Sequence, residues 1–157
     1  MLYKIGITEA GDAGIDLSWA EKLSNVDAAV LITKSISQSF IDSAFKHMEK
    51  LIIHATITGY GHTILEPNVP TLVDESTMVT KIVESGFPIK RIVIRVDPII
   101  PTDKGIKTAW SKKDAEINTM GYQRKGCMCY AGKTELLSHK TKCSNGCLYC
   151  YWKDITD

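Results

Sequence analysis

Short, continuously apolar segments alternate with amphipathic segments over the first two thirds of the chain. The apolar segments cover residues 3–8, 28–34, 51–58 and 91–98, and Pro98 ends the last of them. The segments between them, residues 16–23, 37–48 and 75–86, carry apolar residues at helical spacing, and we expect Ser37 or Ser39 to cap the second and Gly86 to end the third. Apolar strands that alternate with amphipathic helices predict parallel βα units. We therefore predict an α/β fold whose parallel βα units form a partial (βα) barrel, because four units make about half of a barrel.

The chain has 157 residues, of which 44% are hydrophobic, and this is enough apolar material for one core. We predict a βα repeat domain over residues 1–105, a polar connection over 106–121 and a cysteine-rich tail over 122–157. The tail holds six Lys or Arg residues against three acidic residues, an excess of three positive charges. Such an excess favours anionic thiolates or an anionic cluster, although a solvated basic tail has the same composition.

The sequence also indicates the cellular compartment of the protein and the kinds of partner it can have. The first residues reach acidic side chains before any apolar run of signal-peptide length, and no segment approaches the roughly 18 apolar residues of a membrane span. We therefore expect a cytoplasmic protein with reduced cysteines and no membrane partner. The formal net charge of +1 neither supports nor excludes a nucleic-acid partner.

Three of the five cysteines stand close together near the end of the chain, in the segment "KCSNGCLYCYW". Cys143, Cys147 and Cys150 have the spacing C-x3-C-x2-C, which can place three thiolates around one inorganic cluster and leave one iron without a protein ligand. Structural zinc usually takes four ligands, and Cys127 or Cys129 could supply the fourth. These two cysteines are also candidates for a second site. An iron–sulfur cluster, a zinc ion and the absence of any metal all remain open from the spacing alone.

The segment "CSNGCLYC" resembles the cysteine motif of radical S-adenosylmethionine enzymes, including the aromatic residue before the third cysteine. Together with "TITGYGHTILEPNVP" and "RVDPIIP", the segment "GCLYCYW" resembles an uncharacterised bacterial family that is distantly similar to spore photoproduct lyase and carries this motif at the C-terminus. Members of that family have further βα units between "DPIIP" and the cysteines. The sequence is therefore either an abbreviated version or lacks a middle portion, and an abbreviated barrel would leave an edge to be closed by another subunit or another protein.

The resemblance implies a 4Fe-4S cluster on Cys143, Cys147 and Cys150 that cleaves S-adenosylmethionine reductively to a 5'-deoxyadenosyl radical. It also implies a flavodoxin-like or ferredoxin-like reductant, an unknown substrate and a TIM-barrel-like scaffold, and it places Tyr149 near the adenine of the cofactor. The alternative is a non-catalytic protein whose cysteines bind zinc or an iron–sulfur cluster to fold the tail or to recruit a partner.

Further candidates follow the predicted strands, at the edge where βα proteins bind ligands. The acids of the loop "EAGDAG" would repel a phosphate, but Glu9 could meet a cationic group of S-adenosylmethionine, with helix capping by Asp12 or Asp16 as the alternative role of the acids there. Gly59 and Gly61 allow a close backbone approach, to the cofactor or merely in a turn. Arg95 and Asp97 are weak candidates for catalysis, with a structural ion pair as the alternative.

Overall fold

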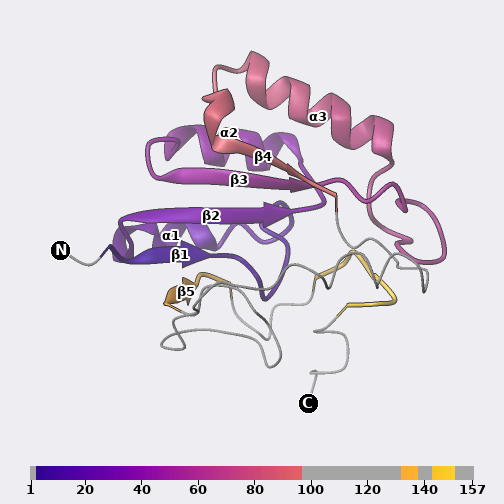
Figure 1. The fold of residues 1–157 in the computed structure, drawn as a ribbon, viewed down its shortest axis with the longest axis horizontal. Helices are drawn as coiled ribbons and strands as arrows, with labels where there is room; N and C mark the ends of the chain where they lie inside the picture. Colours follow the sequence, from indigo (N-terminus) through magenta and orange to yellow (C-terminus); the bar gives the residue numbers. More distant parts are fainter. Residues whose placement is uncertain (1–2, 97–131, 138–142, 151–157) are drawn as a thin grey trace, which may run out of the picture.

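A five-stranded parallel sheet forms the centre of the protein in a computed structural model that describes residues 3–96, 132–137 and 143–150. The strand order is β4-β3-β2-β1-β5, and every neighbouring pair is parallel (Figure 1). The strands are β1 (Ile5–Ile7), β2 (Ala28–Thr33), β3 (Leu51–Thr56), β4 (Ile92–Arg95) and β5 (Lys133–Glu135). The predicted α/β class and all four predicted strands are confirmed.

Three helices connect the first four strands. They are α1 (Trp19–Lys22), α2 (Gln38–Lys46) and α3 (Leu72–Glu84), and the short 3-10 turns η1 (Leu23–Asn25) and η2 (Ile89–Arg91) precede β2 and β4. The predicted cap of α2 is confirmed, since the Ser37 side chain accepts a hydrogen bond from the Phe40 N–H at 3.2 Å. Gly86, with a φ of +93°, follows α3 as predicted.

Two helix boundaries differ from the prediction for local reasons. Helix α1 begins at Trp19 rather than at Asp16, whose side chain instead accepts a hydrogen bond from the Ser18 N–H at 2.9 Å. Helix α3 begins three residues earlier than predicted because Thr71 and Asp74 form a capping box in front of the apolar stripe. A capping box therefore sets the start of α3, whereas a side-chain hydrogen bond of Asp16 to the backbone precedes the start of α1.

The order of the strands determines on which face of the sheet the connecting helices lie. Strands β1 to β4 follow one another across the sheet in chain order, so right-handed crossovers place their helices on one face. Figure 1 shows α1 and α2 together behind the sheet. The sheet also contains a strand that the apolar pattern does not predict, β5, which pairs with β1 in parallel register. A late strand beside the first one is compatible with a partial βα fold.

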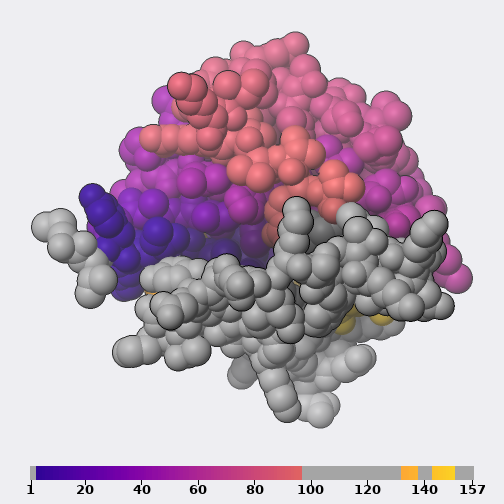
Figure 2. Space-filling view, in the orientation of Figure 1, coloured from indigo at the N-terminus to yellow at the C-terminus, as the bar shows by residue number. Residues whose placement is uncertain are grey.

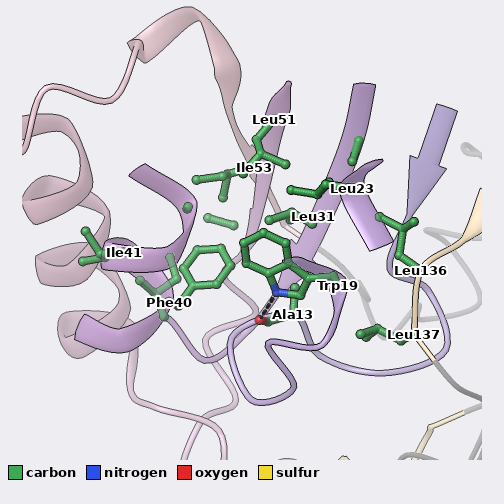
Figure 3. Packing of buried hydrophobic residues seen from close by; sticks show 14 of the residues in the cluster. Ala13, Trp19, Leu23, Leu31, Phe40, Ile41, Leu51, Ile53, Leu136 and Leu137 are labelled. Carbon is green, nitrogen blue, oxygen red and sulfur yellow. Dashed lines mark hydrogen bonds between the residues drawn. The ribbon is translucent and has the colours of Figure 1, made fainter. Parts of the chain in front are cut away.

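The core lies between the sheet and the helices (Figure 3). The rings of Trp19 and Phe40 meet edge to face with centroids 6.1 Å apart, and Trp19 Nε1 donates to the Ala13 carbonyl at 2.9 Å. Leu136 and Leu137, which follow β5, are buried in the same cluster. The two leucines therefore fix the segment around β5 to the first βα unit.

Strand β4 lies at the edge of the described sheet. Ile94 and Val96 are 50% and 65% exposed, and the salmon-coloured segment that ends at residue 96 lies at the surface in Figure 2. Within residues 3–96, 132–137 and 143–150, β4 pairs only with β3. No helix in this part of the chain is long and apolar enough to cross a membrane.

Candidate functional site: a three-cysteine loop at the carboxyl edge of the sheet

Residues 143–150, which we term the cysteine loop, contact the segments that follow β1, β2 and β3. The loop is held by its backbone as well as by its side chains. The Leu148 N–H donates to the Leu65 carbonyl at 2.9 Å, and Asn68 Nδ2 donates to the Ser144 carbonyl at 2.8 Å. Gly146 has a φ of +66° and lies against Pro67 and Asn68, so a side chain there would be both strained and crowded. The cysteine loop is therefore attached to the carboxyl edge of the sheet, where βα proteins bind their ligands.

Asn145 makes the most buried attachment of the cysteine loop. It is 4% exposed, its Nδ2 donates to Asp12 Oδ2 at 2.8 Å, and its Oδ1 accepts from Ser35 Oγ at 2.8 Å. Its backbone carbonyl accepts a longer hydrogen bond, 3.3 Å, from the Asn68 N–H. Asn145 thus joins the cysteine loop to the segments after three different strands.

Asp12 receives this contact as part of a larger set of hydrogen bonds. Its Oδ1 accepts from the Gly14 N–H at 2.8 Å and from Thr33 Oγ1 at 2.5 Å, and its Oδ2 accepts from the Lys34 N–H at 2.8 Å. With Asn145, the buried carboxylate has four donors and is well satisfied. Asp12 therefore fixes the loop after β1 to the end of β2, and both to the cysteine loop.

A second cluster surrounds Glu66, whose side chain is completely buried. Lys34 Nζ lies 2.6 Å from Glu66 Oε1, and the Tyr149 hydroxyl donates to the same oxygen. Thr58 Oγ1 donates to Glu66 Oε2. Lys34 Nζ also donates to the Tyr149 hydroxyl at 2.7 Å and lies 3.9 Å from Cys147 Sγ. A lysine, a glutamate and a tyrosine therefore meet directly beside one of the three sulfurs.

The three thiols of the cysteine loop are free, with Cys147 buried and the other two partly buried. Burial raises the pKa of the Cys143 thiol to about 11, and the charges of Asp12 and of the other two cysteines act in the same direction. Burial also raises the pKa of Cys147, while the neighbouring Lys34 ammonium lowers it. Without a bound cation, burial favours the neutral thiol at both positions.

The donor set fits a sulfur-ligated metal, because three thiolates on one loop are the ligands of iron–sulfur clusters and, with a fourth, of zinc. In the described residues, no group of three or more His, Cys, Asp or Glu side chains is arranged to hold a metal ion. A cluster would therefore require the three sulfurs to converge and to lose their protons.

The other predicted site residues lie at different places along the same edge. Glu9 makes an ion pair with Lys133 of β5, 2.9 Å, and the N–H groups of Glu9 and Ala10 donate to Glu135 at 2.8 and 3.1 Å. Burial raises the pKa of the Glu135 carboxyl, although three backbone N–H groups, those of Leu137, Glu9 and Ala10, act against it. Backbone donors of the "EAGDAG" loop thus bind a carboxylate of the protein itself.

The two predicted glycines differ in their surroundings. Gly59 has a φ of +77° and open space where a side chain would stand, whereas a Cβ on Gly61 would overlap the carbonyl oxygen of Pro70. Arg95 ends β4 beside Thr56, and its carbonyl accepts from the Ile57 N–H at 2.8 Å. The candidates Asp97, Cys127 and Cys129 lie outside the described residues.

Sequence reasoning missed three residues that attach the cysteine loop: Glu66, Asn68 and Asn145. Asn145 stands between two of the motif cysteines, and the other two belong to the proline-bounded segment "EPNVP". The sequence offered one signal for these residues: they are polar side chains that lie in a short, stiff loop or within a cysteine motif. Their partners lie up to 133 positions away, so only the fold identifies them.

No family model matches the chain, and no curated protein and no solved structure matches it either. The fold and the site define a parallel α/β protein with a three-thiol loop at the carboxyl edge of its sheet.

Proposed function

We propose that this protein is a radical S-adenosylmethionine-type enzyme of a reducing compartment, the cytoplasm, with a substrate still to be identified. The proposal includes a partial (βα) barrel as the scaffold and Cys143, Cys147 and Cys150 as the ligands of a 4Fe-4S cluster. The observation that carries it is the attachment of three free thiols, at C-x3-C-x2-C spacing, to the carboxyl edge of a parallel sheet.

The cluster, when bound, would supply one electron from an external reductant to break a carbon–sulfur bond of S-adenosylmethionine. The residues of this chain would provide the rest of the site. Three thiolates would hold three irons and leave the fourth for the cofactor. Lys34 and Glu66 bind the Tyr149 hydroxyl beside Cys147, and the Tyr149 ring would contact the adenine, as the family resemblance implies.

Anaerobic reconstitution with iron and sulfide tests the cluster. We expect about four irons per chain and a broad absorption near 400 nm that dithionite bleaches. Cys147→Ser should lose most of this iron, because each thiolate closes part of the coordination shell. Leu148→Ala is the matched control, since Leu148 lies in the same loop and is 49% exposed. Normal iron content in Cys147→Ser would exclude the cluster assignment.

The enzyme assignment needs its own experiment. The reconstituted protein, reduced with dithionite and supplied with S-adenosylmethionine, should form 5'-deoxyadenosine, and Cys147→Ser should not. An intact cluster without this product would leave an iron–sulfur protein that is not a radical enzyme. Colourless protein with stoichiometric zinc would instead support the non-catalytic alternative.

A further inference from the structure

We propose that Asp12 and Asn145 form a latch that docks the cysteine loop on the sheet edge through protein contacts before any metal binds, so that only the three thiols still have to converge. Asn145 is then a positioning residue for Cys143 and Cys147. The inference deepens the proposed function and depends on it only for the identity of the metal.

The latch rests on two buried polar side chains that satisfy each other. Asp12 is 5% exposed and Asn145 is 4% exposed, and 2.8 Å separates Asn145 Nδ2 from Asp12 Oδ2. The remaining acceptor of the amide, Oδ1, is occupied by Ser35 Oγ. Buried polar groups cost free energy unless they are paired. Separating Asn145 from Asp12 would leave both groups without this hydrogen bond and is therefore unfavourable.

The carboxylate that receives Asn145 is itself rigidly placed. Gly14, Thr33 and Lys34 donate to Asp12 from the loop after β1 and from the end of β2. Asp12 therefore does not need the cysteine loop in order to keep its position. The Asp12 carboxylate is therefore a preformed hydrogen-bond acceptor, to which the Asn145 amide donates.

The place of Asn145 in the motif makes the latch relevant to the thiols. It lies two residues from both Cys143 and Cys147, and the separate contact of Leu148 with Leu65 holds the following turn. Fixing the backbone at these two points restricts where the sulfurs can lie. Metal sites that fold only when the metal binds lack such contacts, so the latch argues for a loop that is docked before the metal binds.

The test uses the metal-free, reduced protein and the rate at which iodoacetamide alkylates Cys147, followed by mass spectrometry of the peptide that contains it. Cys147 is 8% exposed, so we expect slow alkylation in the parent protein. Asn145→Ala should accelerate it about tenfold or more, the factor for losing one buried hydrogen bond of ordinary strength. Asn25→Ala, the same change at an exposed asparagine of η1, should leave the rate unchanged.

A second variant separates the hydrogen bond from the mere size of the side chain. Asn145→Asp keeps the shape and the acceptor for Ser35 but removes the donor and places a negative charge beside Asp12. We expect it to accelerate alkylation at least as much as Asn145→Ala. Hydrogen exchange should show faster exchange in residues 143–150 and unchanged protection in β2 and β3, which verifies that the variants fold.

Three results would overturn the latch. They are Cys147 reactivity in the parent equal to that in urea, an unchanged rate in Asn145→Ala, and a parental rate in Asn145→Asp. None of them involves iron, so a failed latch is distinguishable from a failed cluster assignment, which the iron content of the reconstituted parent decides.

Discussion

Lys34 and Glu66 form an ion pair at the carboxyl edge of the sheet, with Nζ 2.6 Å from Oε1. The glutamate side chain is fully buried, whereas the lysine side chain is 18% exposed. Glu66 also binds Thr58 and Tyr149, so this one carboxylate connects the loop after β3 with the cysteine loop. A buried carboxylate of this kind depends strongly on its cationic partner.

Replacing the lysine should therefore destabilise the protein. We expect Lys34→Met to lower the free energy of unfolding by about 2 kcal/mol, less than for a wholly buried pair because Lys34 is partly exposed and two hydroxyls still donate to Glu66. Urea denaturation measures the change. The double variant Lys34→Met/Glu66→Gln should be more stable than Lys34→Met, since it removes the uncompensated charge. Lys46→Met, at an exposed position of α2, is the control. An equal loss of stability in Lys34→Met and Lys46→Met would contradict the prediction.

Glu75 of α3 should make stability depend on pH. It is 1% exposed, its Oε1 accepts from the Ile36 N–H at 3.4 Å, and within the described residues its Oε2 has no hydrogen-bond partner. Burial, with a smaller contribution from the charges of Asp12 and Asp74, raises the pKa of Glu75 from 4.5 to about 8. Between these two values the folded protein binds more protons than the unfolded chain, so stability should fall as the pH rises from 4.5 to 8.

The slope is at most about 1.4 kcal/mol per pH unit for a single proton. Glu75→Gln should remove this contribution, which urea denaturation at several pH values would reveal as a flatter profile. Glu84→Gln, at an exposed position of the same helix, should keep the parental profile. Parallel profiles for Glu75→Gln and the parent protein would show that Glu75 does not titrate in this range.

The sequence predicted the elements whose signal is local. Strands β1 to β4 are apolar runs, and α2 and α3 carry apolar stripes, so periodicity sufficed to predict these elements, although not the capping box that starts α3. Strand β5 has the polar sequence Lys133–Glu135 and forms because β1 offers a free edge and Glu9 neutralises the buried Lys133. Neither cause is visible near residue 133 in the sequence.

The same distinction separates the parts of the candidate site. The spacing of Cys143, Cys147 and Cys150 is a local pattern and could be read directly. The roles of Glu66 and Asn145 depend on partners from other loops, and a glutamate or an asparagine in a loop is ordinarily solvated. The sequence also assigned Gly59 and Gly61 the same role, whereas their surroundings differ.

The two glycines give a matched pair of substitutions. Gly61→Ala would place a Cβ against the Pro70 and Val69 carbonyl oxygens, so the backbone must move, and we expect a loss of about 2 kcal/mol or more in the free energy of unfolding. Gly59→Ala meets no atom but has a positive φ, so its cost should be about 1 kcal/mol. Thermal or urea unfolding compares them. If Gly61→Ala kept the parental stability but bound S-adenosylmethionine more weakly, we would assign Gly61 to a contact with the cofactor and not to a structural role.

Tyr149 combines two functions that substitutions can separate. Its hydroxyl accepts from Lys34 at 2.7 Å and donates to Glu66, while the residue as a whole is 37% exposed. Tyr149→Phe keeps the ring but removes both hydrogen bonds, so it should loosen the cysteine loop, with faster alkylation of Cys147 in the metal-free protein.

The ring itself is tested by Tyr149→Ala in the reconstituted protein. If the aromatic face stacks on the adenine, its removal should weaken S-adenosylmethionine binding by about 1 kcal/mol, roughly fivefold in the dissociation constant. Titration of Tyr149→Phe should give an affinity close to that of the parent, because stacking needs the ring and not the hydroxyl. Leu148→Ala controls for the loss of exposed apolar surface in the same loop. Parental affinity in Tyr149→Ala would exclude the stacking role and leave the hydroxyl, through Glu66 and Lys34, as the contribution of Tyr149 to the site.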